Sequence, residues 1–267
     1  MSLLGTLTSS VSALDSFTTG LDTIGNDIAN VNTNGFKSAT VSFADTYSGL
    51  GTQVAGTTTN FSQGALNSTG TPTNLGVSGN GFFIVKDPVS GAQYATRDGS
   101  FSLDANGYLV NSQGYRVQGF TGGAGTTAPA TLGDIKLGTP PTGTSLQSVS
   151  FGTSGSMVET YSDGSQATTN QVLLQNFTDP NALISQGNNL YTGFTAAGAL
   201  TTTLGATNAP AQGGLGTVQG GTIEQSNVDL TQEFSSMITM QRAFEANARL
   251  LTVSDTVLED IVNMKTH

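Results

Sequence analysis

Two regular stripes of apolar residues, one at each end of the chain, constrain the fold more than any other feature of the sequence. In the first 31 residues, apolar side chains recur every three or four positions, with one stammer between Leu14 and Phe17. This spacing places them on one face of an α-helix and predicts a helix over residues 3–31. The N-terminal stripe consists of Leu4, Leu7, Val11, Leu14, Phe17, Leu21, Ile24, Ile28 and Val31.

A second stripe near the C-terminus alternates steps of four and three throughout. It predicts a helix over residues 229–264, with Asn227 or Asp229 as its N-cap. Gln241 and Asp255 interrupt the apolar pattern, either because they face solvent beside a two-helix contact or because they select register or line a hydrophilic channel. The seam consists of Leu230, Phe234, Met237, Gln241, Phe244, Ala248, Leu251, Asp255, Leu258 and Val262.

The N-terminal helix has a poor intrinsic tendency to form. Residues 2–30 contain ten Ser or Thr residues together with Gly5, Gly20 and Gly25, and each glycine costs about 1 kcal/mol relative to alanine. We therefore expect this segment to fray in the monomer and to become helical when its stripe meets the C-terminal helix or the helices of neighbouring copies. The alternative is a pair of ordinary amphipathic helices on a β core, but long helices at both extreme ends favour packing between copies.

The middle of the chain alternates short apolar runs with turn residues, as an antiparallel β-meander does. Asn106-Gly107 and Asp163-Gly164 predict type I′ hairpin turns. Segments 121–146 and 195–221 are rich in Gly, Thr, Ala and Pro and predict loops. The expected strands are Phe82–Lys86, Gln93–Arg97, Phe101–Leu103, Tyr108–Val110, Tyr115–Val117, Met157–Tyr161 and Gln171–Phe177.

These patterns predict an α+β fold. The terminal α-helices pair as a coiled-coil-like core domain, and the segment between them forms a mainly antiparallel β domain. We expect residues 1–35 and 225–267 to form the helical core domain, and residues 36–74 to form a linker and extended segment. Residues 75–224 form the central β-rich domain, with a Gly/Thr/Pro-rich loop near 121–150.

Composition excludes much site chemistry. The chain has no Cys, and His267 is its single His, so thiolate sites and His-based triads or zinc sites are excluded. The net charge of −10 disfavours nucleic acid and anionic membranes, and no apolar run is long enough to insert into a membrane. The N-terminus lacks the basic region of a cleaved secretory signal.

Three motifs resemble chemical sites only weakly. Segment 76–81 has the wrong glycine spacing for a nucleotide loop, and the segment from Asp104 lacks the Glu that a calcium loop needs. Asp98, Asp104 and Asp163 lie in turn contexts, which favours backbone roles over a catalytic carboxylate pair. We expect no catalytic residue, cofactor or metal, and no enzyme activity.

Several segments resemble the bacterial flagellar axial proteins, the rod and hook families. The resemblance covers nearly the whole chain. The matching segments are Ile24–Lys37 (IGNDIANVNTNGFK), Gly79–Phe83 (GNGFF), Tyr94–Phe101 (YATRDGSF), Asp104–Val110 (DANGYLV), Asn188–Tyr191 (NNLY), Glu224–Leu230 (EQSNVDL), Met240–Phe244 (MQRAF) and Ser254–Asp255.

Within this group the chain looks most like the hook family, on segments Phe36–Ser38, Ser42–Asp45, Tyr115–Gly119 and Tyr161–Gly164. Hook proteins usually carry an additional outer β-domain where this chain has only the stretch 121–150, so the resemblance implies a short hook subunit without that domain. A distal rod subunit is the alternative, and a secreted β-rich binding protein is the alternative of another class.

The resemblance also implies partners and a location. It implies a helical homopolymer that joins rod to filament and transmits torque, with the terminal helices in the inner core of a tube and the β domain outside. Expected partners are further copies of the chain, the adjoining rod and hook–filament junction proteins, the hook cap and the flagellar export apparatus. Export would follow the flagellar type III pathway, without a cleaved signal.

Overall fold

The computed structural model describes residues 3–46, 51–122, 131–199 and 208–265. The chain divides into two compact units. The helical unit comprises Met1–Val31, Lys37–Phe61 and Val228–His267, and the β unit comprises Asn32–Phe36 and Ser62–Asn227. Two helices and a mainly antiparallel set of strands confirm the predicted α+β class.

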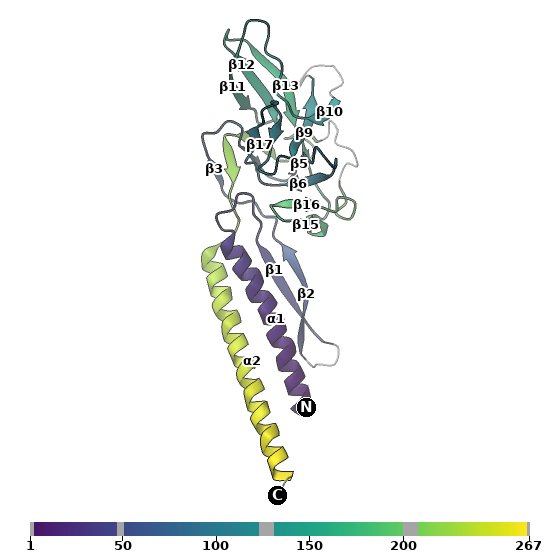
Figure 1. The fold of residues 1–267 in the computed structure, drawn as a ribbon, viewed down its shortest axis with the longest axis vertical. Coiled ribbons are helices and arrows are strands. Elements are labelled where there is room, and N and C mark those ends of the chain that lie inside the picture. The colour runs from purple at the N-terminus through teal and green to yellow at the C-terminus, as the bar shows by residue number, and fades with distance from the viewer. Residues whose placement is uncertain (1–2, 47–50, 123–130, 200–207, 266–267) are drawn as a thin grey trace. The chain divides into compact units, whose positions relative to one another are not determined.

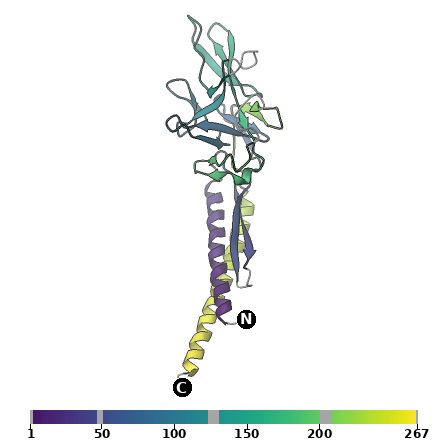
Figure 2. The same ribbon diagram turned by 90° about the vertical axis from the view of Figure 1, so that its right-hand side faces the viewer.

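The helical unit contains both terminal helices, α1 (Leu3–Ala29) and α2 (Leu230–Lys265). They pack against each other and run antiparallel (Figure 1). Asp229 is the N-cap of α2, because its Oδ1 accepts hydrogen bonds from the backbone N–H groups of Thr231 (2.8 Å) and Gln232 (3.3 Å). The C-terminal end of α2 continues past the first turn of α1 (Figure 1 and Figure 2).

A β-hairpin completes the helical unit, formed by β1 (Ala39–Asp45) and β2 (Thr52–Thr59). It packs on α1: the Phe17 and Phe43 rings meet edge to face at 6.0 Å, and the Ser16 hydroxyl donates to the Thr52 carbonyl oxygen at 3.0 Å. The sequence predicts a linker and extended segment over residues 36–74. The difference arises because a two-stranded hairpin is barely stable alone, so its strands depend on contacts with α1 that local sequence does not show.

The strands of the β unit form one large antiparallel sheet, whose strand order differs from the order in the sequence, and two separate two-stranded pairs. In the described residues the large sheet runs β11-β12-β13-β9-β5-β6-β16-β15, with β10 and β8 also on β9, β7 on β8, and β14 on β5. Strands β17 and β4 form one separate pair, and β18 and β3 form the other. The bounds are β3 Leu66–Ser68, β4 Leu75–Ser78, β5 Phe82–Lys86, β6 Gln93–Thr96, β7 Ser102–Leu103, β8 Leu109–Val110, β9 Arg116–Thr121, β10 Thr131–Asp134, β11 Leu146–Phe151, β12 Ser156–Tyr161, β13 Gln166–Val172, β14 Leu174–Gln175, β15 Ile184–Ser185, β16 Leu190–Thr192, β17 Thr217–Gly220 and β18 Thr222–Glu224; a short 3-10 helix spans Pro180–Ala182.

The core of the β unit is aliphatic and aromatic. Its fully buried members include Leu75, Phe83, Val117 and Met157. Gly99 lies so close to this core that an added Cβ would sit 1.6 Å from the Leu75 carbonyl oxygen, so only glycine fits there. The Gly99 carbonyl in turn accepts the Leu75 N–H at 2.9 Å.

Two expectations for the β unit need correction. Asn106 and Asp163 do not have positive φ, whereas Gly107 (φ 81°) and Gly164 (φ 80°) do, so these turns are not type I′. Each turn has its glycine alone in the left-handed region, as longer hairpin turns do, and Asp104 stabilises the first by accepting the Tyr108 N–H at 2.7 Å. The segments expected to be loops also contain β10, which pairs with the preceding strand β9, and β17, which pairs with the distant strand β4. Residues 123–130 and 200–207 lie outside the described part.

Candidate functional site

The buried face of α1 is made mostly of small or polar side chains. Ala13, Ser16, Gly20, Ile24 and Asp27 are buried there. A Cβ added to Gly20 would lie 3.0 Å from Met240 Cε and 3.3 Å from Phe43 Cζ. Gly20 therefore lets α2 and the hairpin approach α1 closely, and α1 uses this small-residue face for contacts inside the chain.

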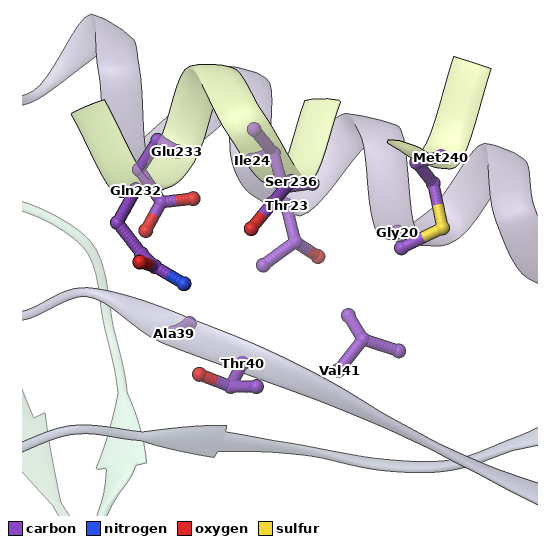
Figure 3. A pocket seen from close by; sticks show the side chains of 10 residues that line it. All are labelled: Gly20, Thr23, Ile24, Ala39, Thr40, Val41, Gln232, Glu233, Ser236 and Met240. Atoms are coloured by element: carbon purple, nitrogen blue, oxygen red, sulfur yellow. The ribbon is translucent and has the colours of Figure 1, made fainter. Parts of the chain in front are cut away.

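A cavity of about 200 Å³ lies between α1, β1 and α2 (Figure 3). Beside this region Asp27 is buried; its Oδ2 accepts the Ala39 N–H at 2.9 Å, and its Oδ1 has no hydrogen-bond partner among the described residues. Burial raises the pKa of Asp27. Burial, together with the negative charges of Asp27 and Asp229, raises the pKa of Glu233. The cavity lining is Gly20, Thr23, Ile24, Ala39, Thr40, Val41, Gln232, Glu233, Ser236 and Met240.

Most of the predicted N-terminal stripe is not fully buried in the isolated chain. Ile24 alone among its described side chains is buried, and Val11 is 54% exposed. The side chain of Leu4 lies outside the described part. The half-buried members are Leu7, Leu14, Phe17, Leu21, Ile28 and Val31.

The predicted C-terminal seam is also only partly covered. Its two polar members, Gln241 and Asp255, are exposed, as are Leu230 and Phe234. The side chain of Val262 lies outside the described part. The half-buried members are Met237, Phe244, Ala248, Leu251 and Leu258.

A further apolar face on α2 lies outside the predicted seam. Its spacing of three, four, four and three residues places its members on one side of the helix. All are exposed, from 39% for Val257 to 80% for Met264. The apolar spacing of this face is visible in the sequence. A prediction that follows only one heptad register, the one that runs through Leu251 and Leu258 of the seam, misses it. We call it the exposed α2 stripe; it consists of Leu250, Val253, Val257, Ile261 and Met264.

The C-terminal half of α2 is therefore apolar on two faces. A helix of this kind is stable in water when partners cover both faces, and contiguous exposed apolar surface marks interaction sites. Such a surface is suited to packing against other helices rather than to binding a small molecule. Among the described residues, no group of three or more His, Asp or Glu side chains is placed to hold a metal ion, and no helix is long and apolar enough to cross a membrane.

Three family models match successive parts of the chain. Residues 7–37 match the model described as flagella basal body rod protein. Residues 76–158 match the flagellar hook protein FlgE/F/G D1 domain, and residues 219–264 match the flagellar basal body rod FlgEFG protein C-terminal region. The first and last matches fall largely on α1 and α2, and the middle match falls in the β unit.

Whole-chain relatives decide the family. The flagellar basal-body rod protein FlgG of Bacillus subtilis is 36% identical over 284 residues, covering 98% of this chain and 100% of the relative. The chain belongs to the family of bacterial flagellar rod and hook proteins. It is a structural protein of the flagellum, as its resemblance to that family implies.

Rod and hook relatives match the chain differently. The rod protein FlgG of Borreliella burgdorferi is 30% identical over 92% of both chains. The hook protein FlgE of Escherichia coli is 44% identical over 136 residues, which is 49% of this chain and 30% of that relative. The two rod relatives thus match this chain over nearly its whole length. The hook relative matches only about half of the chain, but at a higher identity.

Proposed function

We propose that this chain is the subunit of the flagellar hook, a helical homopolymer held together by the terminal helices. The observation that carries the proposal is the exposed α2 stripe, which lies on a helix already packed against α1. A side chain such as Val253, 59% exposed, leaves water when a second copy covers it. Burying a side chain of this size contributes roughly 1.5–3 kcal/mol.

The two helices offer complementary surfaces for such packing. In this proposal the helices of neighbouring copies pack along the inner wall of a tube, where the exposed α2 stripe meets the incompletely buried N-terminal stripe of another copy. Gln241 and Asp255 are exposed between apolar positions. They suit the edge of a helix contact that remains in contact with water. The domain division proposed from the sequence fits this role, because residues near both chain ends supply the assembly surfaces.

The 44% identity to a hook protein over half of this chain supports the hook. A distal rod subunit is the second candidate, favoured by full-length relatives that carry the rod name. We further propose the adjoining rod and junction proteins, the hook cap and the export apparatus as partners, with export by the flagellar type III pathway and no cleaved signal.

Immunogold electron microscopy of isolated hook–basal bodies from the native organism tests this function. An antibody against residues 75–195 binds the β unit and leaves the terminal helices free. Label on the curved extracellular segment is the expected result. Label on the straight segment within the envelope assigns the chain to the rod instead.

Absence of label from both segments contradicts the hook role and the rod role. The secreted β-rich binding protein is then the favoured alternative. The positive control is recombinant protein adsorbed to the same grids. An antibody against an established hook-cap or rod component from the same organism marks the two segments independently.

A further inference from the structure

The cationic side chains of the β unit gather at one place. From the sequence, this unit has four Lys or Arg residues against eight Asp or Glu residues. One of the four, Arg97, is buried. The other three, Lys86, Arg116 and Lys136, lie around Tyr108 and Asp134, and together with Tyr108 we call them the basic patch.

Contacts between four separate segments of the chain define the basic patch. Lys86 on β5 is the direct cross-strand partner of Arg116 on β9. The Arg116 guanidinium lies 3.9 Å from the centre of the Tyr108 ring, and the Lys136 ammonium lies 5.0 Å from it. Both distances are those of cation–π contacts, which hold the charges over an aromatic surface.

The charges of the basic patch are only partly neutralised. Arg116 pairs with Asp134 at 2.9 Å, and the other Asp134 oxygen accepts from the Gln118 amide at 2.7 Å. Neither Lys86 nor Lys136 has an ion-pair partner among the described residues. Lys136 is exposed, and Lys86 is half-buried. Asp104 also acts electrostatically on Arg116, so the patch holds three cationic side chains beside two carboxylates, on a chain whose net charge is −10.

We propose that the basic patch is the face by which the β unit of one copy binds an acidic surface on the β unit of a second copy. This inference rests on the proposed homopolymer and adds a contact outside the terminal helices. Away from the patch, the β unit exposes acidic side chains and no basic ones, among them Asp163 and Asp179. Each copy therefore carries both halves of a complementary pair.

Charge also bears on the symmetry of this contact. A two-fold contact centred on the basic patch would place one patch against another and set like charges together. A head-to-tail contact pairs the patch with a different, acidic surface, and such a contact repeats along an open helical polymer, as the proposed homopolymer requires. Hydrogen bonds from the Ser165 hydroxyl and N–H lower the pKa of Asp163, so this exposed carboxylate is ionised at neutral pH.

The first test reverses the charge of the patch without touching the terminal helices. Full-length Lys86→Glu/Lys136→Glu and the matched Lys86→Arg/Lys136→Arg variant are expressed in native cells lacking the chromosomal copy. We expect at least tenfold fewer labelled hook or rod segments with the Glu variant, at normal export and unchanged thermal unfolding of the purified protein. The Arg variant assembles like wild type.

The second test identifies the partner surface. Because the chain has no Cys, Lys136→Cys carries a single thiol for a photoactivatable benzophenone label. In isolated structures we expect cross-links to a second copy, at peptides containing Asp163 or Asp179. Mixed isotope labelling of the subunits distinguishes links between copies from links within one copy.

Two results overturn the proposal: normal assembly of the Glu variant, and cross-links confined to one copy. If the Glu variant assembles normally but no longer binds an immobilised anionic polysaccharide, the basic patch is assigned to a glycan instead. Failure of the proposed function is distinct, because then wild-type protein itself is absent from the labelled flagellar structures.

Discussion

One ion pair illustrates how single residues hold the β unit together. Arg97 and Glu224 form an ion pair at 3.3 Å, with side chains 4% and 0% exposed. Glu224 also accepts the Gly64 N–H at 2.9 Å, and its backbone carbonyl accepts the Gly35 N–H at 2.7 Å. Glu224 thereby ties together segments that are far apart in the sequence, close to where the chain enters and leaves the β unit.

Replacing Glu224 by Ala should destabilise the β unit by about 3–5 kcal/mol, because it leaves a buried guanidinium without its carboxylate. Urea unfolding followed by near-ultraviolet circular dichroism measures this, since five of the six tyrosines lie in the β unit. Glu245→Ala is the comparison for an exposed pair and is followed at 222 nm, because Glu245 lies on α2 in the helical unit; its 3.7 Å pair with Arg242 should contribute little. Equal effects of both substitutions would contradict the assigned role.

Asp27 should make the helical unit less stable as pH rises. Burial raises its pKa above the ordinary value of 3.8, so between these two pKa values the folded chain binds more protons than the unfolded chain. The unfolding free energy therefore falls as pH rises through that window. Asp27→Asn should flatten this part of the curve, measured as the difference from wild type in urea unfolding at 222 nm. Parallel curves for the two proteins would refute the assignment.

At the scale of elements, two glycines of α1 have opposite consequences. Gly20 contacts Met240 and Phe43, whereas an added Cβ at Gly25 would meet nothing within 4 Å. Gly25→Ala should stabilise the helical unit by about 0.5–1 kcal/mol through helix propensity. Gly20→Leu should destabilise it by about 1–3 kcal/mol through overpacking. Thermal unfolding at 222 nm compares the two, and destabilisation by Gly25→Ala would show that Gly25 has another role.

The terminal elements should exchange their backbone hydrogens quickly in the monomer. We expect weak protection over residues 1–35 and 225–267, because helix propensity in α1 is poor and both helices carry uncovered apolar faces. Hydrogen exchange read by mass spectrometry, before and after assembly, gives the comparison. Strong protection of these segments in the monomer would refute this expectation.

The sequence predicts elements well where the pattern is local and long. The expected helices 3–31 and 229–264 agree closely with α1 and α2, and Phe82–Lys86 is a strand as expected. The hairpin β1–β2 escapes prediction because its stability depends on α1. The small-residue face around Gly20 also escapes, since glycine and serine give no apolar signal even when buried.

At the scale of the whole molecule, substitutions on two faces of α2 separate folding from assembly. Val253→Asp changes an exposed residue, so it should block assembly and leave the monomer folded. Phe244→Asp changes a half-buried position of the predicted seam, and Leu21→Asp changes a half-buried position of the N-terminal stripe on α1. Both should block assembly and also weaken the helical unit. Electron microscopy measures assembly, and circular dichroism at 222 nm measures folding.

Asp255→Asn is the matched control, because it alters an exposed polar position on the same helix. It should assemble like wild type. Normal tubes from Val253→Asp would exclude the exposed α2 stripe as a contact between copies. Normal tubes from either Phe244→Asp or Leu21→Asp would exclude packing between copies along the predicted seam and N-terminal stripe.

The C-terminal turns of α2, which continue past the first turn of α1, have a thermodynamic consequence. Met264 and Ile261 lie in this stretch with most or half of their surface in water. When another copy supplies the missing partner, the folding free energy of these turns includes a term in subunit concentration. The folding of these turns and the growth of the polymer would then have the same critical subunit concentration. Below it these turns unfold, and above it they fold as each subunit joins the polymer.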